Sequence, residues 1–68
     1  MVNTLKLKAA FVENGKTQED VAKAIGLSDT TFSRRMKRAE FGSDEINKMV
    51  EFLNIKDPVS IFFPNWVT

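Results

Sequence analysis

The fold of this chain is decided by residues 17–38, which read TQEDVAKAIGLSDTTFSRRMKR. Thr17 and Asp20 have the spacing of a capping box, with Asp in place of the usual Glu, so a helix is expected to begin at Thr17. Gly26 is expected to end that helix, because glycine adopts a positive φ without strain. Ser28 is a good N-cap for a second helix that runs to the end of the segment. Two short helices joined by such a tight turn are typical of a helix-turn-helix unit.

A further helix is expected before this segment, over about residues 3–13, a stretch rich in Leu, Lys and Ala. Its apolar residues fall on two stripes of the helical wheel, so the apolar arc is wide. The two stripes are Leu5, Ala9 and Val12, and Leu7, Ala10 and Phe11. A wide arc predicts that this helix is buried on more than one side. Asn14 and Gly15 are expected to end it in a left-handed cap.

Two more helices are expected after the segment of residues 17–38. The first begins with Ser43 as its N-cap and has apolar residues at the i, i+3, i+4, i+7 spacing of an amphipathic helix. Those residues are Ile46, Met49, Val50 and Leu53. The second is short, starts at Asp57 and Pro58 (an N-cap followed by proline at the first helical position) and stops before Pro64. The expected fold class is therefore all-α, a small five-helix bundle that forms a single domain over residues 1–68.

Composition excludes several classes of function. The 68 residues allow one domain, and Cys, His and Tyr are all absent. A chain without Cys has no disulfide framework and no thiolate metal site, and a chain without His lacks the commonest general base. We therefore expect no enzyme, no cofactor, no metal and no small-molecule ligand. No apolar run approaches the roughly 20 residues of a membrane span, and residues 1–7 do not form a signal peptide, so a cytoplasmic protein with no membrane partner is expected.

Positive charge is concentrated in one short part of the chain. Residues 27–41 carry four Arg or Lys side chains against two carboxylates, a net +2, although the whole chain has a net charge of only +1. Residues 42–68 carry two Lys against four carboxylates, a net −2. A localised basic segment of this kind is typical of proteins that bind nucleic acid.

The helix expected over residues 29–38 has two distinct faces on a wheel of 100° per residue. Phe32 and Met36 lie on its buried side, and Arg35 lies at the edge of that side. The opposite face collects short hydroxyls and long cations, and no carboxylate lies at its centre. Its members are Thr30, Ser33, Arg34 and Lys37, flanked by Thr31 and Arg38. This face suits the major groove, where Arg and Lys donate to guanine and Ser and Thr contact bases or phosphates. For Arg35 and Arg38 taken singly, a stabilising interaction with the helix dipole is an equal alternative.

Gln18 stands at the start of the preceding helix, where backbone N–H groups point outward and favour a phosphate. A solvent-exposed side chain without a ligand is the alternative for this residue. The lysines of the first half are interpreted as solubilising charges, with a phosphate contact as the alternative for each. They are Lys6, Lys8, Lys16 and Lys23.

The segment from Thr17 to Arg34 closely resembles the helix-turn-helix of phage repressor and Cro-like (Xre-type) regulators. The resemblance implies a lambda-repressor-like five-helix domain that binds palindromic operators as a dimer. It also implies that Gln18 holds a phosphate or a base-pair edge. The recognition positions of that family are occupied here by Ser28, Thr30, Ser33, Arg34 and Lys37.

Two residues depart from the family pattern. Lys16 stands where an apolar residue is frequent, which weakens the hydrophobic staple of the following helix. Arg35 stands where an apolar core residue is common, and we expect Met36 to take over its packing. Since the chain ends soon after the predicted bundle, a stand-alone Cro-type protein or an isolated DNA-binding domain is expected.

The C-terminal residues carry a heavy apolar load, made up of Val59, Ile61, Phe62, Phe63 and Trp66. Val59 and Phe62 are expected to close the core over the first and fourth helices. For Phe63 and Trp66, core packing and a dimer interface are equal alternatives.

The function expected from these features is sequence-specific DNA binding by a phage or prophage Cro/repressor-type regulator. Such a protein occludes a promoter as a homodimer on double-stranded operator DNA. The alternative is a helix-turn-helix protein-interaction module, of the antitoxin or anti-repressor type, that acts through its apolar C-terminal tail.

Overall fold

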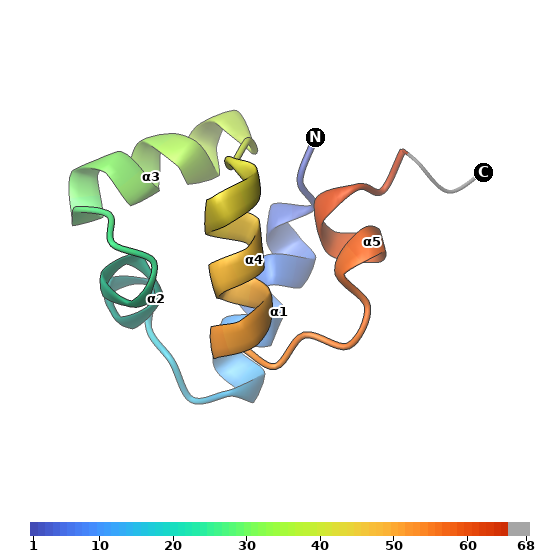
Figure 1. Cartoon of the computed structure of the whole chain (residues 1–68), viewed down its shortest axis with the longest axis horizontal. Coiled ribbons are helices and arrows are strands. Elements are labelled where there is room, and N and C mark those ends of the chain that lie inside the picture. Colours follow the sequence, from blue (N-terminus) through green and yellow to red (C-terminus); the bar gives the residue numbers. More distant parts are fainter. Residues whose placement is uncertain (66–68) are drawn as a thin grey trace.

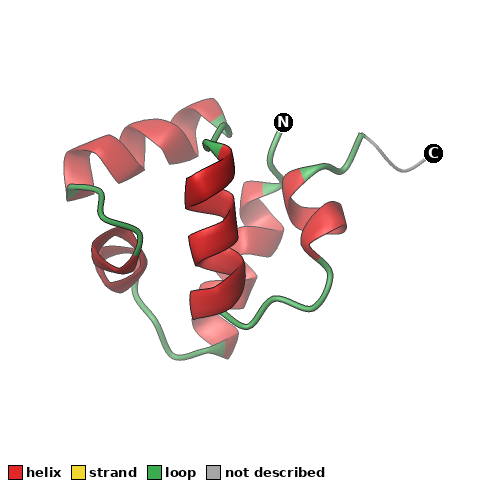
Figure 2. Ribbon diagram, viewed as in Figure 1, coloured by secondary structure: helices red, strands yellow, loops and turns green. Residues whose placement is uncertain are grey.

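The computed structural model describes residues 1–65 and consists of five α-helices (Figures 1 and 2). They are α1 (Thr4–Glu13), α2 (Gln18–Ala24), α3 (Asp29–Arg38), α4 (Ser43–Phe52) and α5 (Pro58–Phe62). No strand occurs in this described part, so the predicted all-α, five-helix class is confirmed. In Figure 1, α4 stands in front of α1, with α2 and α3 on one side and α5 on the other. α2 contacts both α3 and α4, and α1 contacts α2 and α5.

The helices around the turn begin at the caps predicted from the sequence. The Thr17 hydroxyl accepts a hydrogen bond from the Asp20 backbone N–H at 3.1 Å, and the Asp20 carboxylate accepts one from the Thr17 N–H at 2.9 Å. Ser28 accepts a hydrogen bond from the Thr31 N–H at 3.2 Å and caps α3. Gly26, between these helices, has φ +79°, where an L side chain is strained. The capping box, the turn glycine and the second cap are therefore all confirmed.

The start of α4 lies one residue away from the prediction. Gly42 is the N-cap, and Ser43 is the first residue of the helix. The Glu45 carboxylate accepts a hydrogen bond from the Gly42 N–H at 2.8 Å, which is the kind of contact expected of an N3 glutamate. The same Oε1 atom of Glu45 accepts a hydrogen bond from Arg35 Nη1 at 2.6 Å. One carboxylate therefore caps α4 and joins it to α3.

The chain's first residues hold the ends of two helices. The Val2 N–H donates to the Ala39 carbonyl at 2.8 Å, and the Asn3 N–H donates to the Ile61 carbonyl at 2.7 Å. Ala39 is the C-cap of α3 and has a left-handed backbone with φ +56°. Ile61 belongs to α5. The segment before α1 therefore connects the end of α3 to α5.

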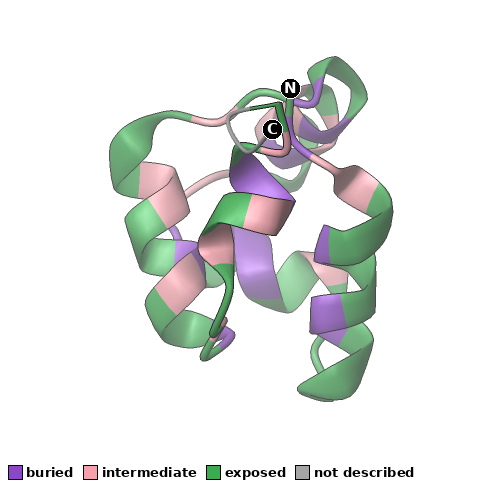
Figure 3. Ribbon diagram, turned by 90° about the vertical axis from the view of Figure 1, so that its right-hand side faces the viewer, coloured by how far each residue is buried: buried purple, intermediate pink, exposed green. Residues whose placement is uncertain are grey.

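α1 is buried on one side only, which contradicts the prediction of burial on more than one side. The stripe of Leu7, Ala10 and Phe11 is buried as expected. Leu5 and Val12 of the other stripe are 80% and 79% exposed. In Figure 3, α1 runs down the right-hand edge with buried and exposed segments in alternation. The physical reason is that α1 packs against α2 and α5, while Leu5 and Val12 are left uncovered by the described residues.

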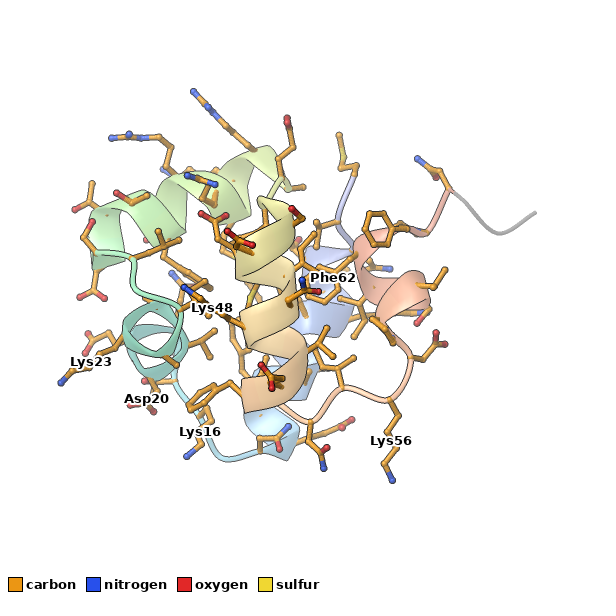
Figure 4. All side chains as sticks on the ribbon, viewed as in Figure 1. Lys16, Asp20, Lys23, Lys48, Lys56 and Phe62 are labelled. Atoms are coloured by element: carbon orange, nitrogen blue, oxygen red, sulfur yellow. The ribbon has the colours of Figure 1, made fainter. Side chains whose placement is uncertain are left out.

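Phe32 of α3 is the centre of the core and is fully buried. Its ring centroid lies 6.2 Å from that of Phe11 and 5.5 Å from that of Phe41, both in tilted arrangements favourable for aromatic pairs. The other helices contribute the buried residues Leu7, Val21, Met49 and Phe62. Phe62 is directed from α5 into the bundle (Figure 4). The core therefore fixes α3 by the side that carries Phe32.

The C-terminal prediction holds for one of its two core residues. Phe62 is buried, but Val59 is 38% exposed, so its predicted place in the core is wrong. Val59 lies in the first turn of a short helix and lines an outer groove beside Lys6, away from the core. Phe63 is 43% exposed, and Trp66 lies outside the described residues.

Lys16, which was expected to weaken the staple of α2, has a different contact. Its Nζ atom lies 5.3 Å from the centroid of the Phe52 ring, near the end of α4 (Figure 4). An exposed cation–π contact of this kind contributes roughly 0.5–1 kcal/mol. The residue before the cap of α2 therefore packs against α4.

None of the five helices in residues 1–65 has the length and apolar character needed to cross a bilayer.

Candidate nucleic-acid interface

The outward side of α3 carries exposed cations. Thr30, Arg34 and Lys37 are exposed, whereas Phe32 and Met36 on the opposite side are buried. Long nitrogen-tipped side chains project from α3 away from the bundle (Figure 4). The division of α3 into a buried and an outward face is therefore confirmed. We call the outward residues Thr30, Ser33, Arg34 and Lys37 the α3 face.

Asp29 joins the edge of this face, which the sequence analysis did not predict. A shallow hollow of about 430 Å³ is lined by Asp29, Thr30, Ser33, Arg34 and Lys37. On a wheel of 100° per residue, Asp29 lies about 60° from Phe32 and so nearer the buried side, but it is the first residue of α3 and is exposed. Its carboxylate repels phosphate and is a hydrogen-bond acceptor of the kind that reads the cytosine amino group.

Gln18 is joined to the α3 face. Its Nε2 donates a hydrogen bond to Ser33 Oγ at 3.2 Å, and both side chains are half-buried. One amide hydrogen of Gln18 is therefore used within the protein, and the second remains for an outside acceptor. Ser33 acts first as the acceptor that orients Gln18.

The start of α2 carries negative charge close to Gln18. Glu19 and Asp20 stand in its first turn. The hydrogen bond from the Thr17 backbone, followed by that from the Thr17 hydroxyl, lowers the pKa of Asp20 below its usual value. Asp20 is therefore ionised at neutral pH. The two carboxylates interact with the same helix dipole that would attract a phosphate, so the end of α2 is a poor phosphate site, and the free amide hydrogen of Gln18 is the donor that this end of α2 offers.

Lys8 of α1, which is predicted to be a solubilising charge with a phosphate contact as the alternative, also reaches this surface. A hollow of about 260 Å³ between α1, α2 and α3 is lined by Thr4, Lys8, Gln18, Ser33, Met36 and Lys37. Lys8 is far from α3 in the sequence, so only the packing of α1 brings it here. The one local signal is that Thr4 and Lys8 are four residues apart and share a side of α1.

Arg35 lies outside the α3 face. Its guanidinium pairs with Glu45 at 2.6 Å, and its side chain is 35% exposed. Met36 is buried in the core, as expected from the departure at position 35. A partly exposed pair of this kind contributes about 0.2–1 kcal/mol to stability.

The last two predicted site residues lie at the ends of α3. Arg38 is exposed in its last turn, one residue beyond Lys37. The Ser28 hydroxyl accepts from the Thr31 N–H and donates to Thr31 Oγ1 at 3.0 Å. Ser28 is therefore first a structural cap.

Within residues 1–65, no three carboxylates gather into a group able to hold a metal ion. No protein-family model, curated protein or solved structure matches this chain. The functional interpretation therefore rests on the α3 face, the residues that adjoin it and the resemblance of residues 17–34.

Proposed function

We propose that the protein is a sequence-specific DNA-binding regulator that places α3 in the major groove. The observation that carries this proposal is the α3 face, in which Thr30, Arg34 and Lys37 are exposed while Phe32 anchors the opposite side. Arg donates to the O6 and N7 atoms of guanine in two parallel hydrogen bonds, and Thr contacts bases or the thymine methyl group. A rigidly anchored helix holds such donors in one register.

Residues around the α3 face supply phosphate contacts. Lys8 and Gln18 lie on the side of α1 and α2, and Arg38 lies at the far end of α3. In Figure 1, α2 is seen nearly end-on while α3 lies across the view, so their axes are steeply inclined. This inclination supports a helix-turn-helix in which α2 crosses the DNA backbone above α3. Contacts to phosphates fix the register in which base edges are read.

The proposed regulator acts by occupancy and performs no chemistry. It binds double-stranded operator DNA in the cytoplasm as a homodimer and occludes a promoter, as a phage or prophage Cro/repressor-type protein does. A two-fold dimer places two recognition helices about 34 Å apart, one turn of DNA. The operator is therefore expected to be palindromic.

The test is a measurement of binding to operator and random DNA over a salt series, with the operator obtained by selection from random sequences. With Lys8 and Arg38 as the cations on phosphates, log K is expected to fall with log salt with a slope of about −1.8 per protomer, at roughly 0.9 for each phosphate. A palindromic selected sequence supports the dimer. A flat salt response, or no binding at low salt, contradicts the proposal.

A second function is favoured by exposed apolar residues of α5 and its C-cap. Phe63 and Val59 are 43% and 38% exposed, as expected of a protein-interaction module of the antitoxin or anti-repressor type. This alternative predicts that Phe63→Ser abolishes function while Arg34→Ala does not. The DNA-binding proposal predicts that Arg34→Ala abolishes base preference.

A further inference from the structure

α1 carries an apolar stripe on its outward side. Leu5 and Val12 are 80% and 79% exposed, and Ala9 between them is also exposed. On the helical wheel the three residues lie within about 60° of one another, opposite the buried side that carries Leu7 and Phe11. In Figure 3, exposed segments alternate with buried ones along α1. An apolar stripe left open along a whole helix marks an interaction surface.

The stripe matches itself when two copies of α1 run antiparallel about a two-fold axis at Ala9. With a rise of 1.5 Å per residue, Leu5 lies about 6 Å to one side of Ala9 and Val12 about 4.5 Å to the other. Leu5 of one copy therefore meets Val12 of the other, and the same contact occurs twice. The two Ala9 side chains meet at the centre, where their small size allows the helix axes to approach closely.

In the same antiparallel register, side chains of opposite charge from the two copies meet along one edge of the stripe. Lys6 and Glu13 lie about 20° apart on the wheel, both toward α5: Lys6 lines a groove with Val59, and Glu13 lines a hollow with Ile61. A two-fold axis perpendicular to both helices keeps this edge of each copy on one side of the dimer. Lys6 of one copy then lies within about 1.5 Å of Glu13 of the other, measured along the helix axis. The pairing thus forms two symmetric ion pairs.

The other edge of the stripe carries Lys8, in the hollow that Gln18, Ser33 and Lys37 also line. By the same symmetry, the two Lys8 edges lie together on the opposite side of the dimer. The two α3 faces therefore turn to one side, as a two-fold protein on DNA requires. This last step rests on the proposed function, whereas the self-association does not.

We infer that α1 is a dimerisation surface for a second copy of this chain. The two copies pair antiparallel through Leu5, Ala9 and Val12, and the Lys6–Glu13 pairs hold them in register. The contact is narrow compared with the interfaces of permanent dimers, so the association is weak and depends on few residues.

Sedimentation equilibrium of the full chain without DNA, at concentrations up to about 1 mM, tests this inference. The parent protein is expected to show a monomer–dimer equilibrium, and Leu5→Glu is expected to stay monomeric throughout. Because Leu5 is 80% exposed, the thermal unfolding of the variant should match that of the parent. A parent chain that is monomeric at every concentration, or a Leu5→Glu variant that dimerises like the parent, overturns the inference.

Charge reversal tests the register. Lys6→Glu and Glu13→Lys are each expected to raise the dimer Kd about tenfold, because each turns two attractions into repulsions. Both changes also suit the helix dipole, so α1 itself is not weakened. The double variant K6E/E13K is expected to recover the parent Kd, and a double variant no better than the single ones overturns the antiparallel pairing.

A control variant in the tail separates this surface from α5. Phe63→Ser is expected to dimerise like the parent, because the α1 pairing does not use Phe63. Loss of the dimer in Phe63→Ser, with Leu5→Glu unaffected, places the interface at the end of α5 and overturns the inference.

Discussion

Replacing Arg34 or Arg35 with alanine is predicted to give opposite results, although the two residues are neighbours in α3. Arg34 is exposed on the α3 face and has no ion-pair partner within residues 1–65. Arg35 turns to α4 and pairs with Glu45 at 2.6 Å. Arg34→Ala is therefore expected to affect DNA binding alone, and Arg35→Ala to affect stability alone.

The sizes of the two effects follow from the surroundings of each side chain. A bidentate contact to a base discriminates by about 1–3 kcal/mol, so Arg34→Ala is expected to raise the operator Kd roughly 5- to 150-fold. The Arg35–Glu45 pair is partly exposed, at 35% and 16% for the two side chains, so solvent screens it and its loss costs about 0.2–1 kcal/mol. In a domain of this size, that cost lowers Tm by roughly 1–8 °C.

Fluorescence anisotropy on operator and random DNA, with thermal unfolding of the same samples, measures both effects. Arg34→Ala should lose affinity for the operator far more than for random DNA and keep the parent Tm. Arg35→Ala should keep the operator preference and lose Tm. Equal losses of Arg34→Ala on every DNA sequence would show that Arg34 contacts only phosphate. Loss of operator preference in Arg35→Ala would refute the assignment of Arg35 to the α3–α4 contact.

Three further predictions concern the core, pH and the salt response. Phe32→Ala should lower the free energy of unfolding by about 3–5 kcal/mol, which is close to the whole stability that a core of this size supplies. Circular dichroism should therefore find the variant largely unfolded at 25 °C. A cooperative transition at the parent Tm would contradict this. The pKa of Asp20 is lowered by its hydrogen bonds from Thr17, so its stabilising effect is present above the unfolded pKa of about 3.9 and is lost as the pH falls through the folded value. Denaturant unfolding of Asp20→Ala should therefore show a shallower loss of stability below about pH 4, and an acid profile equal to that of the parent would count against the capping role. Lys8→Ala should reduce the steepness of the slope of log K against log salt by about 1 per protomer. The control Lys56→Ala lies in the loop between α4 and α5 and should leave this slope unchanged. Equal slopes for the two variants would show that Lys8 does not contact DNA.

The features that sequence predicted well are those decided by a few neighbouring residues. The bounds of α3, its Ser28 cap and the Thr17–Asp20 capping box all depend on groups within one helical turn. The one-residue difference at α4 has the same local origin. Gly42 takes the N-cap because Glu45, three residues on, accepts its N–H, and the hydroxyl of Ser43 is not needed.

The features that sequence predicted poorly depend on what packs against a helix. The wheel shows that Leu5 and Val12 are apolar but not that no described element covers them. Lys8 reaches the α3 face only through the packing of α1, and Gln18 meets Ser33 across 15 residues of chain. Such contacts are set by tertiary arrangement, which spacing within one helix does not encode.

The hydrogen bonds of Val2 and Asn3 place the first residues of the chain against the end of α3 and against α5. The Val2 N–H donates to the left-handed C-cap of α3, so the first peptide unit of the chain helps to fix where the proposed reading helix stops. Tolerance of a terminus to added residues depends on the hydrogen bonding of the backbone that the addition displaces. An affinity tag fused before Met1, which is 80% exposed, would begin one residue from this contact, so the DNA affinity of such a fusion reports on the fusion point as well as on α3.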